Sequence, residues 1–124
     1  MKAPCVLVIE QNRILRANVA KALEKAGYTV EATSRVLDGL RKLDEKTPDL
    51  VIMGRDLPTV EGEEVWARVR QVSYLPTIVL GTEDRTVETL QSGADAYMTM
   101  PLALDELVAR VHAMLRRRRR GVIT

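Results

Sequence analysis

The chain has 124 residues, of which 46% are hydrophobic and 29% charged, and its formal net charge is +2. This length suits one domain with a real core, the composition argues against disorder, and no apolar run approaches the roughly 20 residues of a membrane span. A single cysteine, Cys5, excludes an internal disulfide framework and suits a reducing cytosol, so we expect a cytoplasmic protein without membrane contact.

Short apolar runs alternate with helical patterns in the first half of the chain. Residues 5–9 (CVLVI) predict a strand, and the following helix, with apolar residues three or four positions apart, ends at Gly27. Residues 28–33 predict a second strand, and residues 34–46 a helix with Ser34 as N-cap. The side chains expected to face inward are those of Leu15, Val19, Ala22, Leu23 and Ala26 in the first helix, and of Val36, Leu37, Leu40 and Leu43 in the second.

The second half repeats the pattern three times. Strands are predicted at residues 49–53, 76–80 and 96–100. The predicted helices cover residues 62–72, 83–93 and about 103–117. Inward-facing residues are expected to be Val65, Val69 and Val72, and in the last helix Leu104, Leu107, Val108, Val111, Met114 and Leu115.

Five strand–helix repeats without a hairpin signal predict a parallel sheet between two layers of helices, because the crossovers are right-handed. The first, third and fourth strands are almost continuously apolar, which is typical of strands buried on both faces. The hydrophobic pattern does not define the order of the strands. The fold class is therefore α/β, as a three-layer sandwich.

Basic charge is concentrated at one end of the chain, in Arg116, Arg117, Arg118, Arg119 and Arg120. Without these five arginines, 14 basic residues stand against 17 acidic ones. The rest of the domain is therefore slightly acidic and carries no broad nucleic-acid-binding face.

The sequence resembles the receiver domains of two-component response regulators over nearly its whole length. The resemblance rests on VLVIEQN, PDLVIMGRDLPTVEG, LPTIVLGT and, most specifically, GADAYMTMPLALDELVARVHAMLRR. It implies a flavodoxin-like fold of five parallel strands in the order 2-1-3-4-5. The last helix looks most like that of the OmpR/PhoB-type regulators, whose receiver precedes a DNA-binding domain.

The residues of the family's phosphorylation site are missing from the matching positions. Relative to Pro58, the acceptor aspartate falls on Gly54, and the acidic pair that holds Mg²⁺ falls on Glu10 and Gln11. The hydroxyl residue falls on Gly81, and the lysine on Met100. Phosphoryl transfer needs a nucleophile and placed cations and donors, so the resemblance implies a pseudo-receiver that is not an enzyme, holds no catalytic metal and uses no cofactor.

Two residues near this site offer substitutes. Asp56 lies two residues beyond Gly54 as a displaced acceptor, but a loop carboxylate paired with Arg13, Arg16 or Arg55 is the simpler interpretation. Thr82 similarly offers a hydroxyl, although its neighbour Glu83 favours a role as a helix cap. Glu10 and Asp56 together supply two carboxylates, for which we expect Mg²⁺ binding to be weak or absent.

The two glycines at the strand ends predict a void, and voids in proteins are costly. Met100 is flexible and apolar, so we expect it to fill the space and, with Arg55 or Arg13, to close the pocket permanently. A small ligand in the pocket is the alternative.

The resemblance also implies an output face, formed by the fourth helix, fifth strand and fifth helix. Tyr97 matches the family's switch aromatic, with a half-buried edge tyrosine as the alternative, and Glu106 and Arg110 match residues that form salt bridges across a dimer. Ala96 departs from the usual aspartate there. We therefore expect a homodimer in which apolar contacts provide most of the affinity, because exposed ion pairs contribute only ~0–1 kcal/mol each.

The arginine run has two interpretations, contact with DNA phosphates or a solvated helix end favoured by the helix dipole. His112 is expected on the surface. We assign residues 1–117 to the receiver and 118–124 to the basic start of a linker, leading to an output domain that would contact DNA.

The leading functional interpretation is a phosphorylation-independent receiver of a DNA-binding transcriptional regulator. A stand-alone protein-interaction adaptor is the alternative, and a small-molecule sensor is the weakest one, since no glycine-rich phosphate loop follows any strand.

Overall fold

The computed structural model describes residues 3–60, 64–72, 74–91 and 93–119. Five strands form one parallel sheet in the order β2-β1-β3-β4-β5, which confirms the expected fold class and strand order. The strands are β1 (Cys5–Ile9), β2 (Thr29–Thr33), β3 (Leu50–Gly54), β4 (Thr77–Gly81) and β5 (Ala96–Thr99). The helices are α1 (Arg13–Lys25), α2 (Val36–Lys46), α3 (Val65–Val72), α4 (Thr86–Gln91) and α5 (Leu104–Arg119), with a 3-10 turn, η1 (Glu83–Arg85), before α4.

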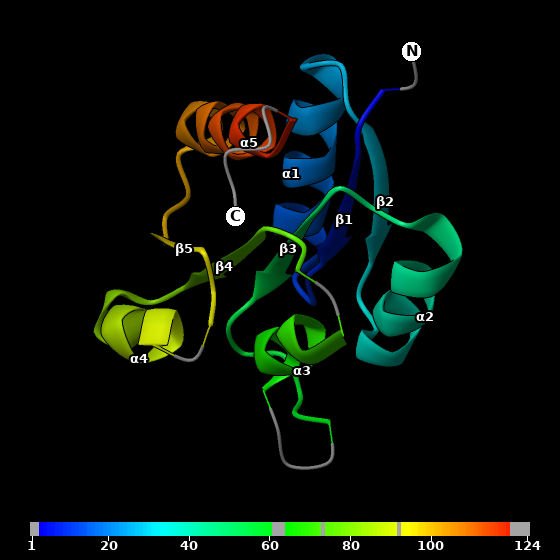
Figure 1. Cartoon of the computed structure of the whole chain (residues 1–124). Helices are drawn as coiled ribbons and strands as arrows, with labels where there is room; N and C mark the ends of the chain where they lie inside the picture. Colours follow the sequence, from blue (N-terminus) through cyan, green and yellow to red (C-terminus); the bar gives the residue numbers. More distant parts are fainter. Residues whose placement is uncertain (1–2, 61–63, 73, 92, 120–124) are drawn as a thin grey trace.

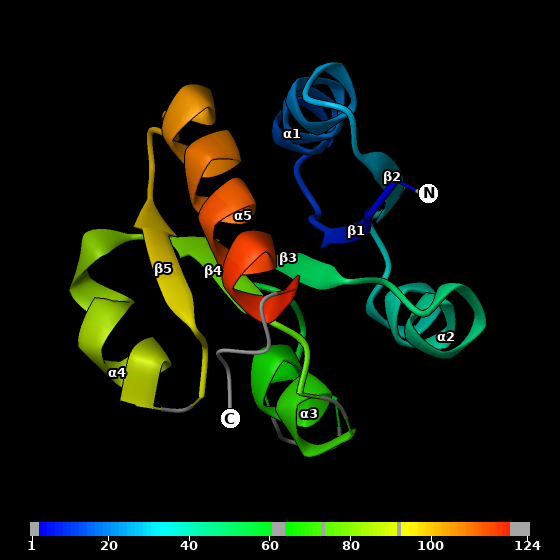
Figure 2. The same cartoon turned by 45° about the horizontal axis from the view of Figure 1, so that its top comes forward.

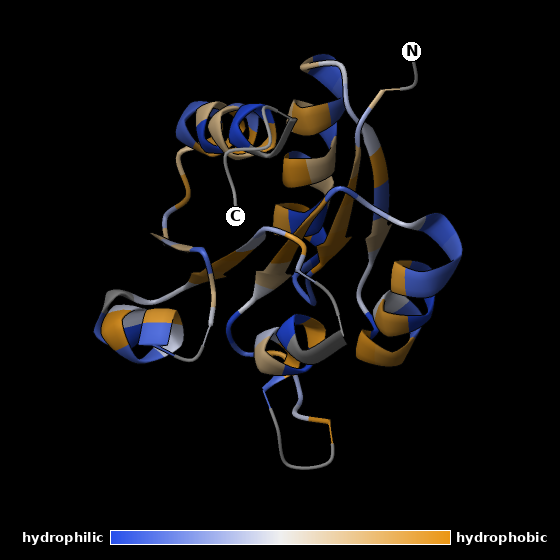
Figure 3. Ribbon diagram, viewed as in Figure 1, coloured by the Kyte–Doolittle hydropathy of each residue, from blue (hydrophilic) through white to orange (hydrophobic). Residues whose placement is uncertain are grey.

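Helices cover both faces of the sheet. Helices α1 and α5 lie together on one face, α2 and α3 lie on the other, and α4 lies beside the edge strand β5 (Figures 1 and 2). The central strands are the most apolar elements, whereas the helices show one apolar and one polar side (Figure 3). This arrangement explains why β3 and β4 are buried along their whole length.

The two faces of the sheet support separate apolar clusters. The cluster under α1 and α5 includes Val8, Ile52, Ile78 and Leu107, and the cluster under α2 and α3 includes Ile9, Met53 and Val79. Alternate strand residues enter opposite clusters because successive side chains of a strand point to opposite faces.

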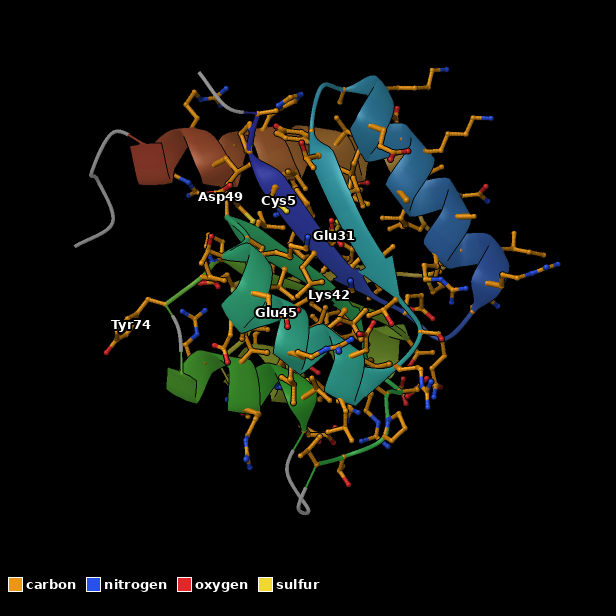
Figure 4. The ribbon with its side chains drawn as sticks, turned by 90° about the vertical axis from the view of Figure 1, so that its right-hand side faces the viewer. Cys5, Glu31, Lys42, Glu45, Asp49 and Tyr74 are labelled. Carbon is orange, nitrogen blue, oxygen red and sulfur yellow. The ribbon has the colours of Figure 1, made fainter. Side chains whose placement is uncertain are left out.

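Polar contacts connect strands to each other and to a helix. The Cys5 amide donates to the Asp49 carboxylate at 2.8 Å, and the Asp49 amide donates to the Cys5 carbonyl at 2.7 Å, which ties the start of β1 to the start of β3. Lys42 of α2 lies 3.2 Å from Glu31 of β2 in an ion pair, whereas Tyr74 projects away from the domain and is 91% exposed (Figure 4).

Two local predictions about α2 were wrong. Leu37 is 72% exposed instead of buried, and the N-cap is Arg35, without a side-chain hydrogen bond, instead of Ser34. The helix begins at Val36, so the inward stripe runs through Val36, Leu40 and Leu43, and Leu37 falls about 100° around the helix from it.

The other inward stripes agree with the structure where it describes them. In α1, Val19 and Leu23 are fully buried and Gly27 has φ +100°, as expected for a residue that stops a helix. The side chain of Val72 lies outside the described residues. Helix α5 extends to Arg119, two residues beyond the predicted end.

Candidate functional site

Parallel strand ends bring the predicted site positions together at one edge of the sheet. Gly54 ends β3 opposite Leu80 of β4, and Gly81 ends β4 opposite Thr99 of β5. A cavity of about 220 Å³ lies at this edge, and the residues lining it include Glu10, Gln11, Gly54, Gly81 and Met100.

The space beside Gly54 is occupied by Glu10. A Cβ atom on Gly54 would lie 2.6 Å from Oε1 of Glu10, so the carboxylate lies where an acceptor side chain would begin. The other oxygen, Oε2, accepts a hydrogen bond from the Asn12 amide at 2.8 Å, which fixes the carboxylate to the start of α1.

The space beside Gly81 is occupied by Tyr97 and Arg55. A Cβ atom on Gly81 would collide with the Tyr97 hydroxyl and lie 2.6 Å from the Cβ of Arg55. The hydroxyl donates to the Thr82 carbonyl at 2.5 Å, and burial raises the pKa of this phenol. Tyr97 therefore points inward, over the end of β4.

The predicted role of Met100 was wrong. Met100 is 39% exposed and lines the cavity at its margin, and Arg13 is also exposed. No filler is needed at the glycines, because Glu10, Tyr97 and Arg55 already occupy that space. A cavity remains beside Met100, so its side chain does not fill this space.

Arg55 is buried between three elements, which its sequence context did not predict. Its side chain is 8% exposed, and its guanidinium lies 3.5 Å from carboxylate oxygens of both Glu64 and Glu88. The guanidinium carbon also lies 4.8 Å from the centre of the Trp66 ring, within the range of a cation–π contact.

Asp56 and Thr82, the two residues proposed as substitutes, do not make the contacts that we expected. Asp56 is exposed and, within the described part of the chain, forms no ion pair with Arg13, Arg16 or Arg55. Arg16 instead donates to the Glu10 carbonyl at 2.8 Å.

The hydroxyl of Thr82 is likewise engaged elsewhere. It donates to Oδ1 of Asp84 at 2.6 Å, a hydrogen bond that lowers the pKa of this carboxyl. The Thr82 carbonyl accepts from the Arg85 amide at 3.3 Å, so Thr82 precedes the 3-10 turn without capping an amide through its side chain.

The donor set does not fit a bound Mg²⁺ ion. Among residues 3–60, 64–72, 74–91 and 93–119, no three histidine, cysteine or acidic side chains are grouped so as to hold a metal. Mg²⁺ prefers an octahedral set of oxygen ligands, and Glu10 faces a glycine where the family's acceptor carboxylate would complete that set.

Comparison with known proteins assigns the family. The model of the response regulator receiver domain matches residues 6–112. The chain belongs to this family. The receiver is 38% identical over 116 residues to the transcriptional regulatory protein TrcR of Mycobacterium tuberculosis, covering 90% of this chain and 45% of TrcR.

A further relative agrees with this assignment, and a solved structure agrees with the fold. The receiver is 37% identical over 127 residues to the phosphate regulon transcriptional regulatory protein PhoB of Rhizobium meliloti, covering 98% of this chain and 56% of that protein. A solved receiver domain from Clostridium thermocellum superposes with a TM-score of 0.83 at 23% identity, over 94% of this chain and 97% of the other. The receiver thus spans about half the length of the curated relatives that it matches.

The face of the receiver formed by α4, β5 and α5 carries the predicted interface residues. Glu106 and Arg110 are exposed and approach each other to 4.0 Å within one helix, and Ala96 is buried. Val87 is 68% exposed and Leu90 is 41% exposed on α4, so this face offers apolar as well as charged contacts.

The basic end of the receiver continues α5. Arg116 and Arg117 are exposed on this helix, whereas the side chains of Arg118 and Arg119, and Arg120 altogether, lie outside the described residues. His112 is exposed, and its Nδ1 atom shares a short hydrogen bond with the Tyr28 hydroxyl. None of the described helices is both long and apolar enough to cross a membrane.

Proposed function

We propose that this receiver acts without phosphorylation, as the regulatory domain of a DNA-binding transcriptional regulator. The observation that carries the proposal is that Gly54 stands at the position of the acceptor aspartate. The carboxylate of Glu10 occupies the space where a side chain at position 54 would begin. TrcR and PhoB are transcriptional regulatory proteins about twice as long as the matching segment, which supports a further domain in the whole protein.

Chemical reasoning supports the loss of phosphoryl transfer. The reaction needs a nucleophile in line with the phosphorus and cations around its equatorial oxygens. Gly54 has no nucleophile, Gly81 has no hydroxyl, and Met100 has no charge. Arg55 lines the cavity, but its guanidinium is already engaged by the carboxylates of Glu64 and Glu88.

Mass spectrometry of the intact protein tests the proposal. We expect no added phosphoryl group after incubation with acetyl phosphate and Mg²⁺, under conditions in which a receiver that keeps its acceptor aspartate is modified. The Asp56→Asn variant is the matched control for a displaced acceptor. A phosphoryl adduct on the wild-type chain that disappears in Asp56→Asn would show that Asp56 took over the role, and the proposal would fail.

We further propose that the receiver pairs with a second copy through α4, β5 and α5. Arg110 of one copy would meet acidic side chains such as Glu106 of the other, while Val87 and Leu90 provide apolar area. Light scattering after size exclusion should give a dimer whose fraction falls in Arg110→Glu. Reversal of an exposed charge on α1, in Lys21→Glu, is the control, and equal effects of the two reversals would contradict this interface.

The proposed contact with DNA belongs to the further domain of the whole regulator. The exposed arginines of α5 alone would neutralise only a few phosphates, so their binding to duplex DNA should be weak and strongly salt-dependent. Titration of this chain with labelled duplex at two salt concentrations measures that contribution. Tight, sequence-specific binding by the isolated receiver would contradict the assignment.

A further inference from the structure

Helix α4 has little apolar attachment to the rest of the domain. Its six residues are all described, and only Thr89 is classed as buried. Among the described residues, the buried hydroxyl of Thr89 has no hydrogen-bond partner, while Val87 and Leu90 are 68% and 41% exposed. Neither apolar cluster includes a residue of α4. Apolar burial therefore does not explain why this helix stays beside β5.

Arg55 connects α4 to the sheet and to the start of α3 through ion pairs. Its amide donates to the Leu80 carbonyl at 2.7 Å, which fixes its backbone against β4. Its side chain then reaches Glu88 in α4 with one Nη atom and Glu64, just before α3, with the other, both at 3.5 Å. The ring of Trp66 lies against the same guanidinium at 4.8 Å.

The position of Arg55 depends on Gly81. A Cβ atom at position 81 would lie 2.6 Å from Cβ and 3.1 Å from Cγ of Arg55, closer than side chains tolerate. The arginine stem can follow this path only because the residue at the end of β4 has no side chain. The glycine and the buried cation are therefore two parts of one arrangement.

We propose that Arg55 is an internal cation that holds α4 in a single position and so fixes the output face without a phosphoryl group. This inference rests on the proposed function, and it adds the device that sets the state of α4. A buried guanidinium is unfavourable unless acidic groups face it, so the burial of Arg55 favours the conformation in which Glu88 stays beside it. The link runs directly from the end of β3 to α4.

Hydrogen exchange of the α4 amides tests the proposal. In Arg55→Met, a change that keeps an unbranched apolar stem and removes the guanidinium group, we expect exchange of residues 86–91 to accelerate by about tenfold or more. The matched control is Arg85→Met, because Arg85 also contacts Glu88, at 3.4 Å, but is 49% exposed. Equal exchange of α4 in the two variants would overturn the proposal.

A second variant guards against loss of folding. Glu88→Gln leaves Arg55 against Trp66 and Glu64, and Glu88 is 60% exposed, so the domain should remain folded. It should reproduce the faster exchange of α4 with little change at α1. Trp66, the only tryptophan, should change its fluorescence in Arg55→Met and stay nearly unchanged in Glu88→Gln. Wild-type exchange in Glu88→Gln would show that Arg55 does not hold α4 through this contact.

The outcome is independent of the phosphorylation test, because all exchange measurements use buffer without a phosphoryl donor. A phosphoryl adduct on the wild-type chain would refute the proposed function and leave the effect of Arg55 on α4 measurable. Conversely, unchanged exchange in Arg55→Met and Glu88→Gln would refute the role of Arg55 even if the chain accepts no phosphoryl group.

Discussion

Alanine at the two strand-end glycines should have unequal effects on stability. In Gly81→Ala the new Cβ meets the Tyr97 hydroxyl and lies 2.6 Å from the Cβ of Arg55. The Cβ of Arg55 cannot move away, because it is attached directly to the backbone. Overpacking of this kind costs about 1–3 kcal/mol. Alanine recovers about 0.5–1 kcal/mol relative to glycine within a strand. We therefore expect Gly81→Ala to lower the free energy of unfolding by about 0–2.5 kcal/mol.

In Gly54→Ala the three atoms nearest to the new Cβ all belong to the Glu10 carboxylate, the closest at 2.6 Å. These atoms end a flexible side chain, which can rotate away at the expense of its hydrogen bond from the Asn12 amide. That bond is worth about 0.5–1.5 kcal/mol, so it roughly offsets the gain from replacing glycine. Gly54→Ala should consequently change the free energy of unfolding by less than about 1 kcal/mol.

Urea unfolding followed by Trp66 fluorescence measures both variants, and the comparison requires equal m-values. The expected result is a lower midpoint for Gly81→Ala than for Gly54→Ala. If the two urea midpoints coincide, or if Gly54→Ala has the lower midpoint, then Tyr97 and Arg55 do not fill the space beside Gly81, and the reasoning about the site is wrong.

Three other changes test separate parts of the structure. Gly27→Ala should lower the free energy of unfolding by about 1–2 kcal/mol through backbone strain alone, because φ is +100° and nothing lies within 4 Å of the new Cβ. An unchanged urea midpoint would contradict this. Leu107→Ala removes a fully buried side chain between α5 and the sheet and should cost about 2–5 kcal/mol, and calorimetry showing a wild-type melting temperature would argue against that packing. Burial raises the pKa of Tyr97 in the folded state, so the stabilisation from its neutral phenol is complete below the unfolded pKa of about 10 and is lost as pH rises through the folded pKa. The free energy of unfolding should therefore fall less above about pH 10 in Tyr97→Phe than in the wild type. Identical pH profiles of the two proteins would exclude this cause.

The sequence was sufficient to predict the order and type of the elements, because both faces of the sheet are covered. Strands β1, β3 and β4 read as continuous apolar runs for this reason, and α5 shows its inward stripe clearly. Prediction failed at α2, where Val36 and Leu37 are equally apolar neighbours. Only the point at which the helix begins decides which of them faces the sheet, and that point depends on the preceding loop.

For the candidate site, the position of Pro58 and the family pattern were enough to bring Glu10, Gly54, Gly81 and Met100 to one edge of the sheet. They were not enough to show how the space is used. The orientation of Glu10 and the burial of Arg55 depend on the shape left by both glycines together, with partners that come from α3 and α4. A periodic pattern contains no information about such contacts between distant segments.

Both apolar clusters reach the cavity, since Leu80 of one and Leu57 of the other line it, but neither cluster includes Glu10, Gln11, Gly54, Gly81 or Met100. At Gln11 and Met100, which are exposed, a substitution therefore removes no side chain from the core. Gly81 is different, because any side chain there would meet Tyr97 and Arg55. In evolutionary terms, the margin of this cavity can vary while the core of the domain stays the same, whereas Gly81 can change only together with its neighbours.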